Sequence, residues 1–403
     1  MDLPGVPSSV LKALQGAARA LGVSRLALVG GVVRDQLLHQ RCGRAWSGVP
    51  DLDWVVEGDA AALVQELGRQ LGSNRISDVQ EHGAFGTVAF QLDGISLDLA
   101  TARQEHYPAP AENPVVRAGT LQADLARRDF TINAMALDLV AGELIDLHHG
   151  QEDLAAGQLQ FLHAGSVQDD PTRVFRAARY AARLGFQLAQ ESREQIRSTI
   201  DQWPWSWCQG DAALAAPPAL ATRLRMELER LLEREPWPQA LDLLEQWKAL
   251  PLLDPQLQND SRRSLRLHWA RRLGLPLMPA FLLGAADPVA VAQRLQIPGK
   301  QQQWLQQCGG LCDWLVDSSP PLNSSPSIWS TALEQLGCQP EAVALAVTLR
   351  PRQWKPLLRW WGRWRQIQAP QTARDLIAAG WQPGPAIGEE LRRQRSAAQD
   401  RSR

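Results

Sequence analysis

The spacing of hydrophobic and polar residues changes character near residue 150. Before this point, stretches with helical spacing alternate with short apolar runs typical of strands. Beyond it, segments rich in Leu, Ala, Arg and Gln have helical spacing, and proline clusters at 204, 217–218, 251–255 and 320–326 separate them. We therefore predict an α+β fold, with a mixed α/β domain at the N-terminus and all-helical modules over residues 150–403.

The N-terminal domain has a recognisable order of elements. We expect helices over Ser9–Leu21, from Val32 to at least Leu38 and over Ala60–Leu71, and strands over Ala27–Val29, Leu52–Glu57, Gly86–Gln91 and Ile95–Ala100. Asp93-Gly94 is a favourable hairpin turn between the last two strands. The pattern predicts a sheet whose strands alternate with helices.

Length and composition are those of a multi-domain globular protein. The chain has 403 residues, of which 45% are hydrophobic and 21% charged, enough for roughly two to four modules with substantial cores. No apolar run approaches the ~18 residues of a membrane span, and Met1–Gln15 lacks an export signal, so we expect a cytoplasmic protein. The five cysteines are irregularly spaced and do not indicate a disulfide framework.

The net charge of −1 conceals an uneven distribution. Residues 350–403 contain twelve Arg or Lys and four Asp or Glu, whereas the rest of the chain is acidic. A basic C-terminal end suggests contact with an RNA backbone, and deleting residues 350–395 should then weaken RNA binding and reduce its salt dependence. Tryptophans lie among arginines there, a pattern typical either of base stacking or of a helical core under long arginine side chains. These tryptophans are Trp354, Trp360, Trp361 and Trp364.

A glycine pair marks a candidate phosphate-binding turn. Gly30-Gly31 follow an apolar strand and precede a predicted helix. Backbone N–H groups at such a turn point at anions, and Arg34 can add a bidentate contact to a phosphate. An ordinary tight turn with a surface arginine is the alternative.

Two aspartates follow the glycine pair in the next predicted strand. Asp51 and Asp53 are separated by one residue, so their side chains point to the same face. Carboxylate oxygens beside a phosphate cradle are what a magnesium-dependent nucleotidyl transferase needs. Asp98 lies on the second strand of the predicted hairpin. It completes the metal site if that strand neighbours the strand of Asp51 and Asp53. A strand edge with solvated carboxylates is the alternative.

A third motif combines adjacent arginines with carboxylates. Arg127 and Arg128 cannot share one helical face, so we expect one to bind a triphosphate or sugar and the other to pair with Asp124 or Asp129. Asn133, four residues after Asp129, can reach a ribose hydroxyl or a phosphate. A surface ion-pair cluster is the alternative.

A fourth motif begins a helix at Asp169-Asp170-Pro171, since proline suits the first turn and an acidic residue can cap it. Four arginines of this helix fall within a sector of roughly 120°. They are Arg173, Arg176, Arg179 and Arg183. Such a stripe can face a nucleotide or an RNA backbone, or it can be a solvated basic face.

In this order, the four motifs resemble those of the class II tRNA nucleotidyltransferases, which include CCA-adding enzymes and bacterial poly(A) polymerases. The run from Gly30 to Asp53 matches the family's metal and triphosphate motif, and Arg127-Arg128-Asp129 with Asn133 matches its ribose motif. Asp169-Asp170 with Arg173 matches its Glu-Asp-x-x-Arg base-reading motif, with Asp169 where Glu is usual. The resemblance covers about residues 26–235 and 374–394 and is weak over 236–373.

The resemblance implies a polymerase-β-like nucleotidyltransferase head with a mixed sheet over residues 1–145. It further implies an all-helical neck over 146–235, a body over 236–345 and a basic tail over 346–403 that binds tRNA. Two Mg²⁺ ions at Asp51 and Asp53, ATP and CTP as substrates, and tRNA as partner follow from it, and no obligatory protein partner does. The implied ligands of triphosphate and ribose are Gly30, Gly31, Arg34, Arg128, Asp129 and Asn133, with Asp170 and Arg173 on the base and Arg176 and Arg179 as further nucleotide or RNA contacts.

The implied base reader is consistent with the chemistry of the bases. Cytosine and adenine both present an amino donor beside a ring-nitrogen acceptor, whereas uracil and guanine present the opposite pattern. A carboxylate that accepts and a guanidinium that donates, as in Asp170 and Arg173, match C and A and reject U and G. We therefore predict template-free addition of C and/or A to the 3′ end of tRNA.

Several alternatives remain open. Members of the family add CCA, only CC, only A, or poly(A), and the resemblance places the discriminating flexible loop at Arg103–Gly119. An RNA-binding protein with an inactive head is a rival that the intact Asp51 and Asp53 oppose. A metal phosphohydrolase is a second rival because of His148-His149 and Asp153, but the hinge that the resemblance places at Asp146–Leu154 explains these residues.

Overall fold

The computed structural model describes residues 4–46, 51–72, 74–83, 86–202 and 218–402. The chain divides into two compact units. The first comprises Met1–Ser206, Ala212–Arg223 and Glu235–Ala249, and the second comprises Trp207–Asp211, Leu224–Arg234 and Leu250–Arg403. The division crosses the region of the predicted neck and body, and the four-domain arrangement stays a prediction.

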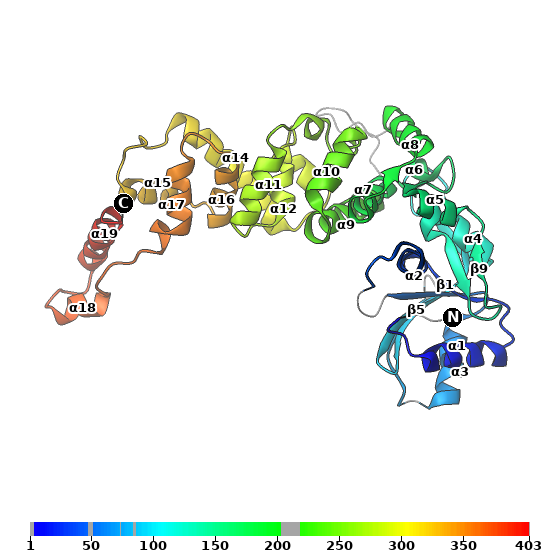
Figure 1. The fold of residues 1–403 in the computed structure, drawn as a ribbon. Coiled ribbons are helices and arrows are strands. Elements are labelled where there is room, and N and C mark those ends of the chain that lie inside the picture. Colours follow the sequence, from blue (N-terminus) through cyan, green and yellow to red (C-terminus); the bar gives the residue numbers. More distant parts are fainter. Residues whose placement is uncertain (1–3, 47–50, 73, 84–85, 203–217, 403) are drawn as a thin grey trace. The chain divides into compact units, whose positions relative to one another are not determined.

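A seven-stranded mixed sheet forms the centre of the N-terminal part of the first unit (Figure 1). The strands lie in the order β3-β4-β5-β2-β1-β8-β9, and β2 and β5 run parallel while the other neighbours are antiparallel. Their bounds are β1 Leu26–Val29, β2 Leu52–Val56, β3 Ile76–His82, β4 Thr87–Leu92, β5 Ile95–Thr101, β8 Met135–Asp138 and β9 Leu144–Asp146. The predicted strands and the hairpin of β4 and β5 are confirmed.

Strand alternation decides which face of the sheet carries the candidate site. Val55 packs with Ala27, Val29 and Ala136 against α4 (Leu121–Ala126) in one buried cluster. Asp53 precedes Val55 by two residues and therefore projects from this same face. The fully buried Trp54 points to the other face. The candidate carboxylates thus lie on the α4 side of the sheet.

Three helices pack on this sheet where the hydrophobic spacing predicts them. They are α1 (Ser8–Ala20), α2 (Gly31–Cys42) and α3 (Ala60–Leu71). Helices α1 and α3 lie side by side through buried faces that include Leu14 and Leu63 (Figure 1). Asp59 caps α3 by accepting from the backbone N–H groups of Ala61 and Ala62.

The stretch Arg103–Gly119 departs from the expected open loop. It forms a hairpin of β6 (Arg103–His106) and β7 (Val115–Ala118). Its tip is held at Ala111, whose side chain is fully buried and whose N–H donates to the carbonyl of Gln168 at 3.1 Å. The segment is therefore a fixed part of the first unit.

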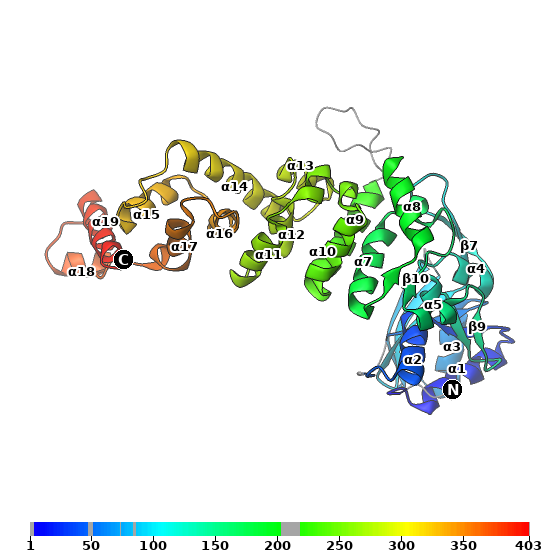
Figure 2. The same ribbon diagram turned by 45° about the horizontal axis from the view of Figure 1, so that its top comes forward.

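Among its described residues, the remainder of the first unit is helical, as predicted, apart from one pair of two-residue strands. The elements are a 3₁₀ turn Thr131–Asn133, α5 (Gly150–Ala156), β10 (Gln158–Leu159), α6 (Ser166–Asp169), α7 (Thr172–Leu184), β11 (Gln187–Leu188), α8 (Gln190–Asp201), α9 (Pro218–Arg234) and α10 (Trp237–Gln246). Strands β10 and β11 pair in parallel, which is the exception to the all-helical expectation. Helices α7 and α10 pack side by side (Figure 2).

The second unit contains helices throughout its described residues, and α9 contributes to both units. Its centre is α16, in which every residue from Ala342 to Thr348 is buried between α14 and α17. The helices are α11 (Arg263–Arg272), α12 (Leu277–Leu282), α13 (Pro288–Arg294), α14 (Gly299–Asp317), α15 (Pro326–Gln335), α16 (Pro340–Thr348), α17 (Trp354–Gly362), α18 (Ala373–Ala378) and α19 (Pro385–Asp400), with 3₁₀ turns at Leu250–Leu252, Pro255–Asn259 and Trp364–Gln366. No helix in the described ranges has the length and apolarity needed to cross a membrane.

Candidate active site

The candidate metal-binding carboxylates lie on the two parallel strands of the sheet. Asp51 immediately precedes β2, and the register sets Asp53 directly beside Asp98 of β5, so the expected neighbourhood of the strands is confirmed. Loss of water inside the site raises the pKa of the Asp53 carboxyl; Arg128 opposes this shift, and the like charges of Asp98 and Asp51 add to it.

This carboxylate group fits the predicted Mg²⁺. Like-charged carboxylates that resist ionisation are stabilised by a divalent cation, and hard oxygen donors are the ligands that Mg²⁺ prefers. The described residues contain no group of three or more His, Cys, Asp or Glu arranged as a metal site. Asp51 and Asp53 as the metal ligands, and Asp98 as a third ligand, stay predictions.

The glycine pair brings the start of α2 close to these carboxylates. Gly30 has φ 75°, in the left-handed region that favours glycine, and it directly precedes the first residue of α2. A Cβ at this position would lie 3.3 Å from Nη1 of Arg128 and 3.6 Å from Oδ2 of Asp53. The first N–H groups of a helix lack partners within the helix and attract anions. The backbone at Gly30 and Gly31 thus offers a phosphate-binding turn beside the carboxylates.

Both adjacent arginines pair with one buried carboxylate. Asp124 is fully buried and accepts from Arg127 at 2.7 Å through Oδ1 and from Arg128 at 2.9 Å through Oδ2. Burial raises the pKa of Asp124, but the two guanidinium groups outweigh it and the pKa is lowered. The predicted pairing with Asp124 is thus made by both arginines, and the contact of one of them with a triphosphate or sugar stays a prediction. Arg128 is held between Asp124 and Asp53, where it faces the candidate metal site.

The other predicted ribose and phosphate ligands form one buried network. Nη1 of Arg34 donates to Asn133 at 2.7 Å, Asn133 donates to Asp129 at 3.0 Å, and Nε of Arg176 donates to Asp129 at 2.8 Å. Arg34 is only 4% exposed and also binds its neighbour Asp35. The network joins α2 of the head to α7. The predicted contacts of these groups with triphosphate and ribose stay a prediction.

The candidate base reader lies at the start of α7. Oδ1 of Asp170 accepts from the hydroxyl and the N–H of Thr172, at 2.7 Å and 3.2 Å, and lies 3.5 Å from the guanidinium of Arg223. Arg173 donates to the hydroxyl of Ser166 at 2.6 Å and to the carbonyl of Arg127 at 2.8 Å. Both groups are therefore held in place by contacts that leave Oδ2 and further N–H groups for a base.

A cavity of about 620 Å³ has the candidate catalytic carboxylates in its wall. It lies between the first turns of α2 and the last turns of α7. The guanidinium groups of Arg34 and Arg183 lie 5.0 Å and 4.9 Å from the centre of the Tyr180 ring. The lining also includes Gly31, Asp35, Arg44, Trp46, Asp51 and Asp53.

Five of these lining residues are absent from the predicted site: Asp35, Arg44, Trp46, Tyr180 and Arg183. The sequence feature that could have pointed to Arg44 and Trp46 is the presence of a cation and an aromatic ring shortly before Asp51. Of the two further predicted contacts, Arg176 binds Asp129, and Arg179 binds Glu235 at 3.1 Å.

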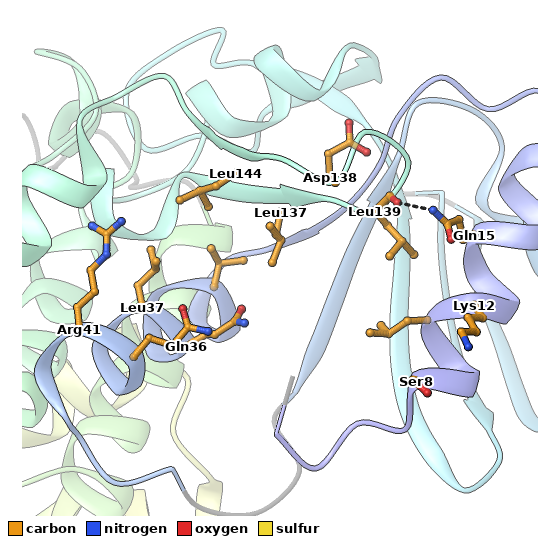
Figure 3. Close-up of a pocket in the computed structure, with 14 residues that line it drawn as sticks. Ser8, Lys12, Gln15, Gln36, Leu37, Arg41, Leu137, Asp138, Leu139 and Leu144 are labelled. Carbon is orange, nitrogen blue, oxygen red and sulfur yellow. Dashed lines mark hydrogen bonds between the residues drawn. The ribbon is translucent and has the colours of Figure 1, made fainter. Parts of the chain in front are cut away.

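A second cavity of about 580 Å³ lies elsewhere on the head (Figure 3). Side chains of α1 and α2 face it from two sides, with Lys12 and Gln15 on one and Gln36 and Arg41 on the other. None of the predicted site residues lines it. The candidate chemistry therefore belongs to the Asp51/Asp53 cavity.

The two carboxylates on either side of His148-His149 have structural partners. Asp146 accepts from the N–H groups of Gly150 and Gln151 and so caps α5. Asp153 accepts from the hydroxyl of Thr131 at 2.6 Å. His149 is exposed and has a left-handed φ of 60° before α5. These contacts support the hinge interpretation of the segment.

Comparison with known proteins identifies the family. Residues 26–160 match the family model of the poly(A) polymerase head domain. The CC-adding tRNA nucleotidyltransferase of Deinococcus radiodurans is 34% identical to the chain over 386 residues, which cover 91% of this chain and 83% of the relative. The chain belongs to the tRNA nucleotidyltransferase family.

Other members of the family agree with this assignment, and the protein is a nucleotidyltransferase. The A-adding tRNA nucleotidyltransferase of Aquifex aeolicus is 41% identical over 180 residues, which cover 44% of this chain and 20% of the relative. A solved structure of a CCA-adding enzyme in an apo form has a TM-score of 0.71 at 24% identity, covering 97% of this chain and 93% of that chain. The predicted fold, a polymerase-β-like head followed by helical modules, is confirmed.

Proposed function

We propose that this nucleotidyltransferase adds cytidine residues to the 3′ end of tRNA, from CTP and without a nucleic-acid template. One observation carries the choice of product: the relative that aligns along nine-tenths of the chain is a CC-adding enzyme. CC addition is the narrower form of the predicted addition of C and/or A. Such a tRNA substrate would be met in the cytoplasm.

The chemistry proposed is attack of the tRNA 3′-hydroxyl on the α-phosphate of CTP, with pyrophosphate as the leaving group. Asp51 and Asp53 would hold two Mg²⁺, which supply activation of the hydroxyl and neutralisation of the phosphate charge. The turn at Gly30 and Gly31 binds phosphate oxygens through backbone N–H groups. Arg128, fixed by Asp124, presents its charge where negative charge develops, and a preorganised group of this kind needs no rearrangement during the reaction.

Base selection is assigned to Asp170 and Arg173. Oδ2 of Asp170 accepts from the exocyclic amino group of cytosine, and an N–H of Arg173 donates to its ring nitrogen. The same pattern fits adenine, so this pair rejects U and G but does not by itself exclude A. An enzyme that adds C but not A therefore needs a further structural element.

The β6–β7 hairpin is the element that supports a single kind of product. Arg223 donates to the carbonyl of Ala111 at 2.6 Å, and Ala111 donates to Gln168, two residues before Asp170. Because the hairpin is fastened beside Asp170 and Arg173, it restricts movement of these two residues that would be needed to accept a different base. The resemblance places the product-determining loop at this segment, and its fixed state supports an enzyme that stops after C.

A-addition is a second candidate, because A-adding relatives have the higher identities of 41% and 39% over the aligned part of the chain. The two candidates differ in the substrate they extend. We would offer tRNA ending at the discriminator base, in C or in CC, each with one labelled nucleotide and Mg²⁺. CC addition predicts two C on the first tRNA, one on the second, and neither C nor A on the third.

The other outcomes of this assay name the alternatives. Addition of A to tRNA ending in CC would show an A-adding or complete CCA-adding enzyme, and long A tracts would show a poly(A) polymerase. Retained tRNA binding without incorporation of any nucleotide would overturn the proposed function and favour an inactive RNA-binding head. The variant Asp53→Asn is the negative control for incorporation.

A further inference from the structure

Three arginines line the Asp51/Asp53 cavity. They differ in how many of their N–H groups already bind other groups of the protein. Arg34 donates from Nε to Asp35 at 2.8 Å, from Nη2 to Asp35 at 3.1 Å and from Nη1 to Asn133 at 2.7 Å. Turning this buried group toward a ligand would leave Asn133 and Asp35 without their donors, at a cost comparable to that of a lost hydrogen bond. Arg34 is therefore a fixed part of the wall.

Arg183 retains charge that its surroundings do not cancel. Its guanidinium lies 3.5 Å from Glu235, and the same carboxylate oxygen accepts from Arg179 at 3.1 Å. One carboxylate shared by two guanidinium groups leaves a net positive charge. The Arg183 side chain is 44% exposed, so it can turn to an anion while Glu235 remains paired with Arg179.

Arg44 is the second available cation of the cavity. It is exposed, stacks over the ring of Phe186 at 5.8 Å and donates through Nη2 to the carbonyl of Leu184 in the last turn of α7. The partners of its guanidinium in the described structure are an uncharged carbonyl and an uncharged ring, which leave its positive charge uncancelled. The carbonyl and the ring fix the side chain, and its other N–H groups remain for a ligand.

The positions of these arginines match the length of a bound nucleotide. The base reader is at the first turn of α7, and Arg183 follows Arg173 by ten residues, or ~15 Å along a helix. This is the scale of a nucleoside triphosphate from its base to its last phosphate. Asp51 and Asp53, which would hold the metal ions at the α-phosphate, line the same cavity as Arg44 and Arg183.

We propose that Arg44 and Arg183 bind the β- and γ-phosphates of the incoming nucleotide and hold the pyrophosphate as it leaves. In the step, the 3′-hydroxyl loses its proton to water as its oxygen forms a bond to the α-phosphorus, the bond from this phosphorus to the α–β bridging oxygen breaks, and pyrophosphate takes the electron pair. The inference rests on the proposed nucleotidyl transfer. It adds two arginines outside the predicted site to the phosphate contact predicted for Arg34.

Binding measurements separate this role from a structural one. The variants Arg44→Gln and Arg183→Gln should each weaken binding of CTP and of inorganic tripolyphosphate about tenfold, since a charged hydrogen bond is lost. Binding of CMP and the preference for C over U should not change. Arg41→Gln is the matched control, because Arg41 is exposed on the last turn of α2 and donates to Gln151 outside the cavity. Unchanged tripolyphosphate binding, or an equal loss for CMP, would overturn the proposal.

A second measurement uses the unmodified protein and does not depend on how a variant folds. Tripolyphosphate should protect Arg44 and Arg183, but not Arg41, from phenylglyoxal, as read by mass spectrometry of the peptides. Equal modification of Arg44 with and without tripolyphosphate would contradict the proposal. These binding results test only the phosphate contacts. The proposed function fails if the wild-type protein incorporates no nucleotide, and this outcome is measured separately.

Discussion

The arginines that bind Asp124 and Asp129 in the first unit and Arg350 in the second unit are held in different ways. In the first unit, buried carboxylates fix them: Asp124 binds Arg127 and Arg128, and Asp129 binds Arg176. In the second unit, Arg350 lies on rings instead, 3.9 Å over Trp354 and 5.1 Å over Trp269. A carboxylate orients a guanidinium and neutralises its charge. An aromatic ring also orients it but does not neutralise the charge, which stays available to a ligand from solvent. The first arrangement suits a preorganised site and the second suits a surface for a polyanion.

The largest effect is expected where the first unit leaves carboxylates unpaired. Asp53→Asn should reduce nucleotide incorporation about a thousandfold or more, ~4 kcal/mol, because a metal ligand is lost. The pKa of Asp53 in the folded protein is raised, so above its unfolded pKa this carboxylate disfavours folding. The melting temperature of Asp53→Asn in EDTA at neutral pH should therefore be no lower than that of the wild type.

The matched control is Glu81→Gln, which removes an exposed carboxylate from β3 in the same sheet. It should leave both incorporation and melting temperature unchanged. A clear loss of stability in Asp53→Asn without metal would mean that the carboxylate has a structural partner and is not held for a cation.

The second effect tests whether buried carboxylates fix the arginines of the site. Arg176→Gln removes a charged partner of Asp129 and should lower the free energy of unfolding by about 2–3 kcal/mol, since Asn133 still donates to the buried carboxylate. Urea unfolding near neutral pH measures it. A cost below half a kcal/mol would contradict the comparison.

Its pH dependence has a definite sign. Burial raises the pKa of Asp129, but Arg176, Asn133 and Arg173 outweigh it and the net pKa is lowered. The stabilisation is therefore present above the unfolded pKa of ~3.9 and is lost as pH falls through the lower folded pKa. The stability difference between wild type and Asp129→Asn should shrink on acidification over this range.

The head and its motifs were predictable because apolar runs and turn residues determine them locally. Helix α3 has the predicted bounds, and Asp93-Gly94 makes the predicted turn. The edge strand β3 was not predictable, since its residues are almost all exposed and lack alternation; backbone pairing with β4 makes it a strand. The pairing of Arg34 with Asn133 spans 99 residues, so only the folded chain shows that Arg34 is buried and occupied.

A smaller effect, on specificity, is expected at the base reader. Arg173→Ala should reduce the preference for C over U by tenfold or more, in line with about 1–3 kcal/mol for a well-placed pair of hydrogen bonds to a base. The ratio of kcat/KM for CTP and UTP measures it. Ser166→Ala, which removes a partner of Arg173 at 2.6 Å, should give a smaller change in the same direction. Equal C-over-U preference in Arg173→Ala and wild type would contradict the assignment.

The second unit shows where the sequence pattern was ambiguous. Of the tryptophans among arginines, Trp360 and Trp364 are buried, so the interpretation as a helical core is right for them. Trp354 is half-buried and carries Arg350 on its ring, so base stacking stays open there. Helical spacing alone did not separate these cases, because the partner ring, Trp269, belongs to α11 some 85 residues earlier.

The smallest effect concerns this Trp–Arg stack. Arg350→Gln should weaken tRNA binding by about tenfold or less and reduce the slope of log affinity against log salt by ~1, because one phosphate contact is lost. Trp354→Leu should weaken binding through lost stacking and leave the salt slope unchanged. Arg374→Gln, an exposed arginine on α18, serves as the charge-matched control. If Arg350→Gln and Arg374→Gln change affinity and slope equally, the ring-held arginine has no special role and only the general basic charge of the C-terminal residues binds RNA.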